Sequence, residues 1–509
     1  MKAVRLTNRR LCEAATPYVF SNVELNMSKA SLGRLENISR HPVIGPLVRQ
    51  IHLRLPFHHS TLATNIYKFT SHAWNIPYGE LNNIEYGDSK AKTLDNIKTF
   101  RQDLENWREI SRRDATKERS QALFRGDRLL QRAFVKYGEG FLEERELRQG
   151  NSFVEMAAKL VKGLPNLEQL VIVGRPWDYE NLPVCSLREA EERGGGPPWA
   201  LQREKKPCDL TDHDVFRLIS APMQWGDAQN LERIFLGDNT RTMLNILTML
   251  GREGVKLRGL FINISPPWRY SNLCCSSQAE RALCELTDGL EYFRLQVKNV
   301  PDMSGCEYQV WLQRELSDLG DLRTFTDSIL QSRGLREIRL NLAALSAETK
   351  NATWHVNMLM TPREWPELRE LSLFNITIYS SKLGLLLGQR KEKLSLTLID
   401  RTVSYGTWRE ALDVMHRMAA MGGLRLHELN GGWGAEFGAL SRYERGGGIR
   451  GTLFGRLQFG THWPDLYTRG RALCYIMQIK EYGPYRVNPF DTDQLSQRLG
   501  EPFVFEPRL

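Results

Sequence analysis

The sequence predicts an α/β solenoid, in which parallel strands line one face and helices cover the other. The first observation is a phrase with apolar residues at positions one, four and six, as in Leu335, Ile338 and Leu340, with charged residues between them. Its second half alternates as a half-buried strand does, and Gly334 marks a turn before it. The second observation is that the phrase returns after spacers long enough to hold a helix, which parallel strands require.

Each copy of the phrase is expected to form one strand. The copies begin at Phe20, Val48, Leu167, Leu231, Leu257, Leu290, Leu335 and Leu368. From position 231 to positions 257, 290, 335 and 368 the spacings are 26, 33, 45 and 33 residues. These lengths straddle the usual leucine-rich repeat and extend beyond it. We therefore expect an irregular leucine-rich-repeat-like solenoid, with a mixed α/β protein that has no solenoid as the alternative.

Helices are expected where apolar residues recur at helical spacing between these strands. The expected helical ranges are 4–15, 31–40, 95–119, 123–148, 153–161, 243–250, 279–286 and 408–418. Two further strands are expected at 394–398 and 426–429. Residues 175–209 contain a run of glycines and prolines and are expected to form a long loop outside the array.

The expected strands and helices divide the chain into five parts. They are a short helical segment at 1–25, the first helix and strand of the array at 26–57, a charged helical insertion at 58–150, the degenerate repeat array at 151–430 and an irregular cap at 431–509. The last part is rich in aromatic residues and proline, and a terminal repeat needs such a cover over its open end.

Residues 1–25 resemble the second half of an F-box, in the form that precedes leucine-rich repeats in large fungal F-box families. The residues that match are Leu6, Arg10, Leu11, Ala15, Thr16, Pro17 and Phe20. The resemblance implies a substrate-recognition adaptor of a Skp–cullin–F-box ubiquitin ligase. The residues that would then contact a Skp-type adaptor protein are Val4, Leu6, Leu11 and Pro17.

The first half of the F-box motif, a Leu-Pro pair and an apolar helix, is not in this sequence. We therefore expect the Skp-type adaptor to bind this chain weakly or not at all. The alternative function is a repeat-built protein-interaction scaffold that has no connection to the ligase.

A protein substrate is expected to bind the strand side of the array, where residues that flank positions four and six point away from the core. Aromatic residues and arginines there would be the anchors of an interface. The candidates are Phe235, Phe261, Asn263, Tyr292, Arg294, Arg339, Asn341, Glu370 and Phe374. The alternative is that some of these aromatic residues belong to the core. Ser372 is expected to face outward on the same side.

Composition excludes several classes of protein. With 41% hydrophobic and 25% charged residues, the 509-residue chain is an ordinary globular one, and no apolar run is long enough to span a membrane. The charged N-terminus is unlike a secretory signal, so we expect a cytoplasmic or nuclear protein. The net charge of +9 is spread along the chain, which makes nucleic-acid binding a poor explanation.

No pattern in the sequence predicts catalysis, a cofactor or a metal. None of the eight cysteines falls in a CxxC pair, and the glycine runs 431–434 and 446–448 lack the Lys-Ser/Thr ending of a phosphate loop. His58 and His59 have no companions at metal-ligand spacing and are expected at the surface, as is the run 212–214. We therefore expect the chain not to be an enzyme.

Overall fold

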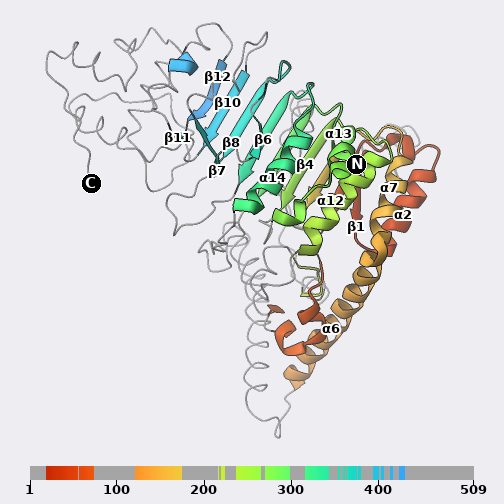
Figure 1. Cartoon of the computed structure of the whole chain (residues 1–509). Helices are drawn as coiled ribbons and strands as arrows, with labels where there is room; N and C mark the ends of the chain where they lie inside the picture. Colours follow the sequence, from red (N-terminus) through yellow and green to blue (C-terminus); the bar gives the residue numbers. More distant parts are fainter. Residues whose placement is uncertain are drawn as a thin grey trace, which may run out of the picture. The chain divides into compact units, whose positions relative to one another are not determined.

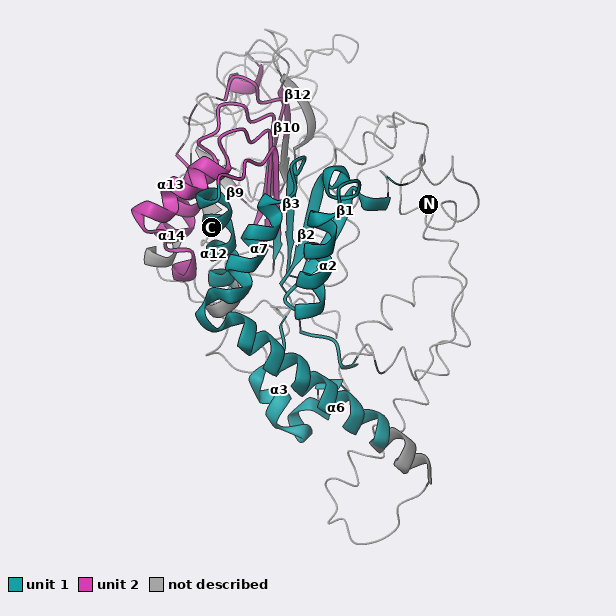
Figure 2. Cartoon of the chain, turned by 90° about the vertical axis from the view of Figure 1, so that its right-hand side faces the viewer, with its two compact units in different colours: residues 1–253, 263–268, 299–310 teal, residues 254–262, 269–298, 311–509 magenta. Residues whose placement is uncertain are grey.

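A computed structural model gives the fold of the chain (Figure 1). It describes residues 16, 19–55, 57–70, 72–73, 121–174, 216, 219–223, 237–264, 270–297, 316–342, 354–355, 359–361, 363, 365–374, 376–379, 394–399, 403–405, 413–416 and 424–429. These residues form an α/β protein built from parallel strands and helices. Two compact units divide the chain (Figure 2): residues 1–253, 263–268 and 299–310 form the first, and residues 254–262, 269–298 and 311–509 form the second.

The first unit contains three parallel strands in the order of the sequence. They are β1 (Asn22–Asn26), β2 (Gln50–Arg54) and β3 (Gln169–Val173). Val23, Ile51 and Leu170 lie side by side across the three strands, and all three are buried. This register follows from the alternation of apolar and polar residues, because shifting a strand by one residue would turn its apolar side chains away from the core.

Helices of the first unit pack against one another in a row, with α2 against α7 and α7 against α12. Their bounds are α2 (Lys29–Arg40), α7 (Ser152–Lys162) and α12 (Gly237–Arg252), with short 3-10 turns η2 (Gly45–Leu47) and η3 (Gln149–Asn151). The Ser28 side chain accepts a hydrogen bond from the Ser31 amide and so begins α2. Gly150 and Asn151 adopt positive φ angles at the bend that leads into α7.

A long helix, α6 (Gln121–Arg148), extends from the first unit and carries the shorter helix α3 (Ser60–Thr64) along its side (Figure 2). Phe69 and Tyr137 are buried where the segment after α3 meets α6, and their ring centroids lie 5.4 Å apart. The expected insertion helix at 123–148 is thus confirmed, and it is packed on apolar and aromatic neighbours.

The second unit repeats one strand arrangement several times. Its strands, in spatial order, are β4 (Gly259–Ile264, of which residues 259–262 belong to this unit), β5 (Tyr292–Val297), β6 (Glu337–Leu342), β8 (Glu370–Phe374), β10 (Leu394–Ile399) and β12 (Leu424–Leu429). The described pairs from β5 to β12 are all parallel. In Figure 1 the helices α13 (Ser277–Leu286) and α14 (Leu316–Ile329) lie in front of part of this set of strands. The 3-10 turn η5 (Tyr270–Leu273) packs against α14.

Three short strands form a second parallel sheet in this unit, in the order β11-β9-β7. They are β7 (Trp354–His355), β9 (Ile376–Tyr379) and β11 (Val403–Tyr405). Along the chain each one falls between two successive strands of the larger set, so the chain visits the two sheets alternately.

The core of the second unit confirms the burial that the strand phrase predicts. Position one is occupied by Leu257, Leu290, Leu335 and Leu368, each at most 1% exposed. Positions four and six are also buried, with the most exposed, Leu295, at 3%.

The starts of β6 and β8 also repeat the same backbone hydrogen bonds. The Glu291 carbonyl accepts hydrogen bonds from the amides of Arg336 and Glu337 at 2.7 and 3.0 Å, and the Arg336 carbonyl accepts from the next pair, Arg369 and Glu370, at 2.8 and 3.0 Å.

Most helices and strands expected from the sequence lie where the structure has them, including the late strands at 394–398 and 426–429 and a helical turn at 413–416 within the expected range 408–418. The sequence did not predict α14 or the second sheet. The expected helices at 4–15 and 95–119, the strand at 231–236, the long loop 175–209 and the cap 431–509 lie outside the described residues.

Candidate functional site

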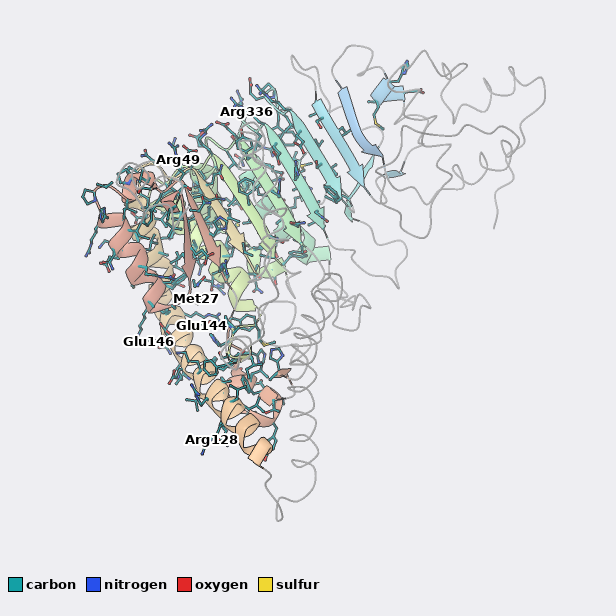
Figure 3. All side chains as sticks on the ribbon, turned by 180° about the vertical axis from the view of Figure 1, so that it is seen from behind. Met27, Arg49, Arg128, Glu144, Glu146 and Arg336 are labelled. Carbon is teal, nitrogen blue, oxygen red and sulfur yellow. The ribbon has the colours of Figure 1, made fainter. Side chains whose placement is uncertain are left out.

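The side chains of β5, β6 and β8 that point away from the leucine core form one surface, which we call the polar strand face (Figure 3). Strand register sorts them into three rows, each running across the strands. The rows are Tyr292, Glu337 and Glu370; Arg294, Arg339 and Ser372; and Gln296, Asn341 and Phe374.

Four of these residues form a charge ladder, Arg294, Glu337, Arg339 and Glu370, in which positive and negative groups alternate. Arg294 Nη2 donates to Glu337 Oε1 at 3.2 Å, and Arg339 Nε lies 2.8 Å from the same oxygen. Arg339 Nη2 then reaches Glu370 Oε1 at 2.5 Å, and Ser372 Oγ donates to that oxygen at 3.3 Å. Each carboxylate therefore joins neighbouring strands through the arginines beside it.

Arg294 is the most deeply placed cation of the ladder, with 12% of its side chain exposed. Its Cζ atom lies 5.8 Å from the centre of the Phe261 ring, within the range of a cation–π contact. Burial, followed by the positive charge of Arg339, lowers the pKa of Arg294 below its usual value. Its Nε atom is buried and donates no hydrogen bond within the described part of the chain.

The structure brings seven of the nine sequence candidates together on this side of the second unit: Phe261, Tyr292, Arg294, Arg339, Asn341, Glu370 and Phe374. Asn263 falls in the segment 263–268, which belongs to the first unit. Phe235 lies outside the described residues, as do Val4, Leu6, Leu11 and Pro17.

Two expectations about this surface need correction. Phe261 is only 5% exposed and packs under Arg294, so it is a core residue, as the alternative had it. Ser372 lies on the expected side but is 3% exposed, because it sits against Glu370. Neither residue is a free contact point for a partner.

Glu337, which was not among the residues expected from the sequence, links the two arginines of the ladder and is 10% exposed in its side chain. The signal was present, because Glu337 precedes Arg339 by two residues and a strand places alternate residues on one side. The sequence pattern did not indicate that Glu337 pairs with Arg294 on the neighbouring strand, because the two residues are 43 positions apart.

In the first unit His59 is buried and His58 is only 12% exposed in its side chain, so the expectation of surface histidines was wrong. His58 Nδ1 lies 2.7 Å from Glu144 Oε1, and its backbone amide donates to Glu144 Oε2 at 2.9 Å. The His58 ring also meets the Tyr137 ring edge to face at 4.7 Å. These contacts hold the segment before α3 against α6, which indicates a structural role.

We expect Gly140→Ala to destabilise this joint. A Cβ atom at Gly140 would lie 2.5 Å from His58 Cε1 and Nε2, and the ring has no room to give because Glu144 and Tyr137 hold it. The expected cost is about 1–3 kcal/mol of unfolding free energy, as for other overpacked sites. Urea unfolding followed by circular dichroism measures it.

Gly138→Ala is the matched control, two residues earlier in α6. There the nearest atom to an added Cβ is the Ala63 carbonyl oxygen at 3.7 Å, an ordinary contact. Alanine in a helix interior then stabilises by about 0.5–1 kcal/mol relative to glycine. Equal effects of the two substitutions would contradict the packing of His58 on Gly140.

Within the described ranges, no group of three or more His, Cys, Asp or Glu side chains is placed to hold a metal ion. Among the helices described, none is both long enough and apolar enough to cross a membrane. Comparison of the chain with protein families, with curated proteins and with solved structures finds no match. The proposed function therefore rests on the geometry of the polar strand face.

Proposed function

We propose that this chain is a non-catalytic protein-binding scaffold of leucine-rich-repeat-like solenoid type, and that the polar strand face is its recognition surface. The observation that carries the proposal is the charge ladder, which places two half-buried arginines on neighbouring strands, on the same face as the half-buried side chains of Tyr292, Asn341 and Phe374. Arginine and aromatic side chains in partly desolvated positions are the usual anchors of protein interfaces.

Repetition in the second unit supports the solenoid form. Successive strands stand next to one another in sequence order, and from β6 to β12 a strand of the second sheet falls between each pair along the chain. At Arg258, Glu291 and Arg336 the backbone carbonyl accepts hydrogen bonds from two consecutive amides at the start of the next strand. A chain that repeats one coil presents its strand side as a continuous surface, which is the form that repeat proteins use for binding.

A donor in the charge ladder that lacks an acceptor supports the use of the ladder as an anchor for a partner protein. A buried donor that lacks an acceptor costs free energy, and a side chain that turns toward a partner's acceptor on binding would recover that cost. Arg294 Nε is such a donor. Because Glu337 and Glu370 already balance the charges of Arg294 and Arg339, we expect the ladder to favour a partner with well-placed acceptors over one that is merely acidic.

Binding is tested by Asn341→Lys, which places a long charged side chain on the middle strand of the polar strand face, where Asn341 is half-buried. Partners are first captured with the wild-type chain and identified by mass spectrometry, and the dissociation constant of one of them is then measured. We expect a loss of affinity of about tenfold or more, which corresponds to about 1.4 kcal/mol, with the melting temperature nearly unchanged.

Gln331→Lys is the control for that experiment. Gln331 is exposed in the turn after α14, and the substitution has the same chemistry. If both variants bind the partner as tightly as the wild-type chain does, the polar strand face is not the recognition surface. The double variant Phe261→Ala, Arg294→Ala is a poor test of binding, because it removes a core ring and leaves Glu337 without one of its cations.

The more specific form of the proposal is the substrate adaptor of a Skp–cullin–F-box ubiquitin ligase, and it rests on the sequence resemblance of residues 1–25. The scaffold would then act by holding a target near the ubiquitin carrier, which raises its effective concentration. A calorimetric titration with a Skp-type adaptor tests this form. We expect weak binding at most, because the first half of the motif is not in the sequence, and Leu6→Asp, Leu11→Asp should abolish any binding that the wild-type chain shows. Absence of binding by the wild-type chain would leave the scaffold without a ligase connection.

A further inference from the structure

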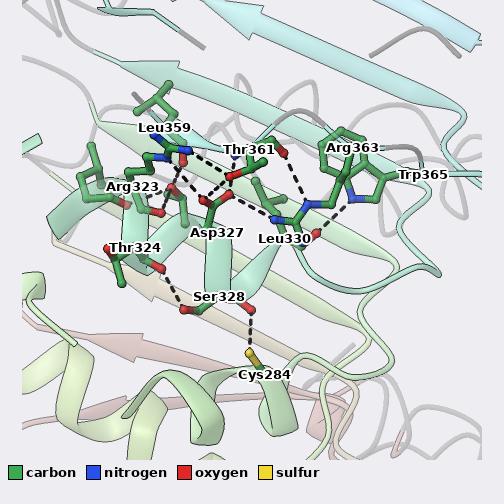
Figure 4. Close-up of polar contacts among 12 residues, drawn as sticks. Cys284, Arg323, Thr324, Asp327, Ser328, Leu330, Leu359, Thr361, Arg363 and Trp365 are labelled. Carbon is green, nitrogen blue, oxygen red and sulfur yellow. Dashed lines mark hydrogen bonds and ion pairs between the residues drawn. The ribbon is translucent and has the colours of Figure 1, made fainter. Parts of the chain in front are cut away.

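A polar cluster in the second unit lies between α14 and the segment that leads into β8 (Figure 4). Its centre is the Asp327 carboxylate on α14. The Thr361 amide donates to Asp327 Oδ1 at 2.5 Å, and the Thr361 hydroxyl donates to Asp327 Oδ2 at 2.8 Å. Asp327 therefore holds both the backbone and the side chain of an exposed threonine.

Two arginines surround the same threonine. Arg323, one helical turn before Asp327, donates from Nη2 to Thr361 Oγ1 at 3.2 Å and places Nε 3.5 Å from Asp327 Oδ2. Arg363 donates from Nε to the Thr361 carbonyl and from Nη2 to Asp327 Oδ1, each at 3.4 Å. Two guanidinium groups thus share one carboxylate, which leaves one positive charge in excess beside the Thr361 hydroxyl.

The sequence adds a second, independent feature at this hydroxyl. Thr361 is followed by Pro362, and the chain contains only two other serine- or threonine-proline pairs, at Thr16 and Ser265. Proline restricts the residue before it to extended backbone. The hydroxyl of an exposed serine or threonine that is followed by proline is the acceptor that proline-directed protein kinases use.

We propose that Thr361 is a phosphorylation site whose phosphate is received by Arg323 and Arg363. In the transfer, Thr361 Oγ1 attacks the γ-phosphorus of ATP bound to the kinase. The Oγ1–P bond forms as the bond from phosphorus to the leaving oxygen of ADP breaks, and the hydroxyl proton passes to a base of the kinase. The cluster then changes from two cations and one anion to two cations facing a phosphate and a carboxylate.

Phosphorylation exchanges the partner of Thr361. The phosphate carries a charge of about −1.5 to −2 at neutral pH and offers three acceptor oxygens. It repels the Asp327 carboxylate, whereas Arg323 and Arg363 already lie within hydrogen-bond reach of Thr361 and can pair with it. The exchange would release the Thr361 amide from Asp327 and so loosen the start of the segment that leads to β8. This inference does not depend on the proposed binding function.

Phosphorylation itself is tested on the full chain with ATP and a proline-directed serine/threonine kinase, followed by site mapping by mass spectrometry. We expect phosphate on Thr361 and none at that position in Thr361→Ala, with Thr16 and Ser265 as comparison sites in the same molecule. An unmodified Thr361, under conditions in which the kinase phosphorylates a control substrate, overturns the proposal.

Binding of the phosphate by Arg323 and Arg363 is tested by following the ³¹P signal of phosphothreonine as pH changes. Pairing with two cations should lower the second pKa of the phosphate below its ordinary value of about 6. Arg323→Gln and Arg363→Gln should each return it toward that value, and circular dichroism checks that both variants are folded. If the phosphate titrates identically in the wild-type chain and in both variants, the arginines do not receive it.

Discussion

Leu371→Asp is expected to unfold the second unit or to lower its free energy of unfolding by about 4 kcal/mol or more. Leu371 is fully buried in β8, and register places it between Ile338 of β6 and Leu396 of β10. An aspartate there loses the apolar contacts of leucine and leaves a carboxylate with no partner in the core, which costs several kcal/mol. Thermal unfolding followed by circular dichroism measures the effect.

Leu371→Met is the control at the same position, because it keeps the volume and the apolar character and should cost less than about 1.5 kcal/mol. Ser372→Asp, one residue along, was expected from the sequence to cost little. The structure changes that expectation, since Ser372 is buried and its hydroxyl bonds to Glu370. We now expect an intermediate loss, and a Leu371→Asp variant as stable as Ser372→Asp would contradict the register.

Trp365→Ala is expected to cost about 3–5 kcal/mol, as for other large buried aromatic residues. Trp365 is 1% exposed and precedes β8, and its Nε1 atom donates to the Leu330 carbonyl at the end of α14 at 3.0 Å (Figure 4). The side chain therefore fastens α14 to the chain entering β8 by both packing and a hydrogen bond. Urea unfolding of the variant measures the loss.

Trp365→Phe separates these two contributions. Phenylalanine keeps an aromatic ring but cannot donate to the Leu330 carbonyl, so the expected cost is about 1–3 kcal/mol for the unsatisfied acceptor, beyond the small loss of volume. If Trp365→Ala and Trp365→Phe destabilise equally, the hydrogen bond carries the effect. If neither variant loses stability, Trp365 does not fasten α14.

The sequence by itself determined which side of each strand is buried. Leu335, Ile338 and Leu340 lie in the core as the phrase predicted, and so do their counterparts in the neighbouring strands. The same local periodicity located α6 and α13. These features follow from the sequence because the period of apolar residues is a property of a few consecutive positions.

Only the tertiary structure decided what each polar or aromatic side chain meets. Glu337 links Arg294 to Arg339, and the mostly covered His58 lies against Glu144, 86 residues away. Phe261 was expected on the binding surface but is buried, because the Arg294 side chain lies over its ring. Such outcomes depend on which distant segments pack together, and no spacing within one strand or helix contains that information.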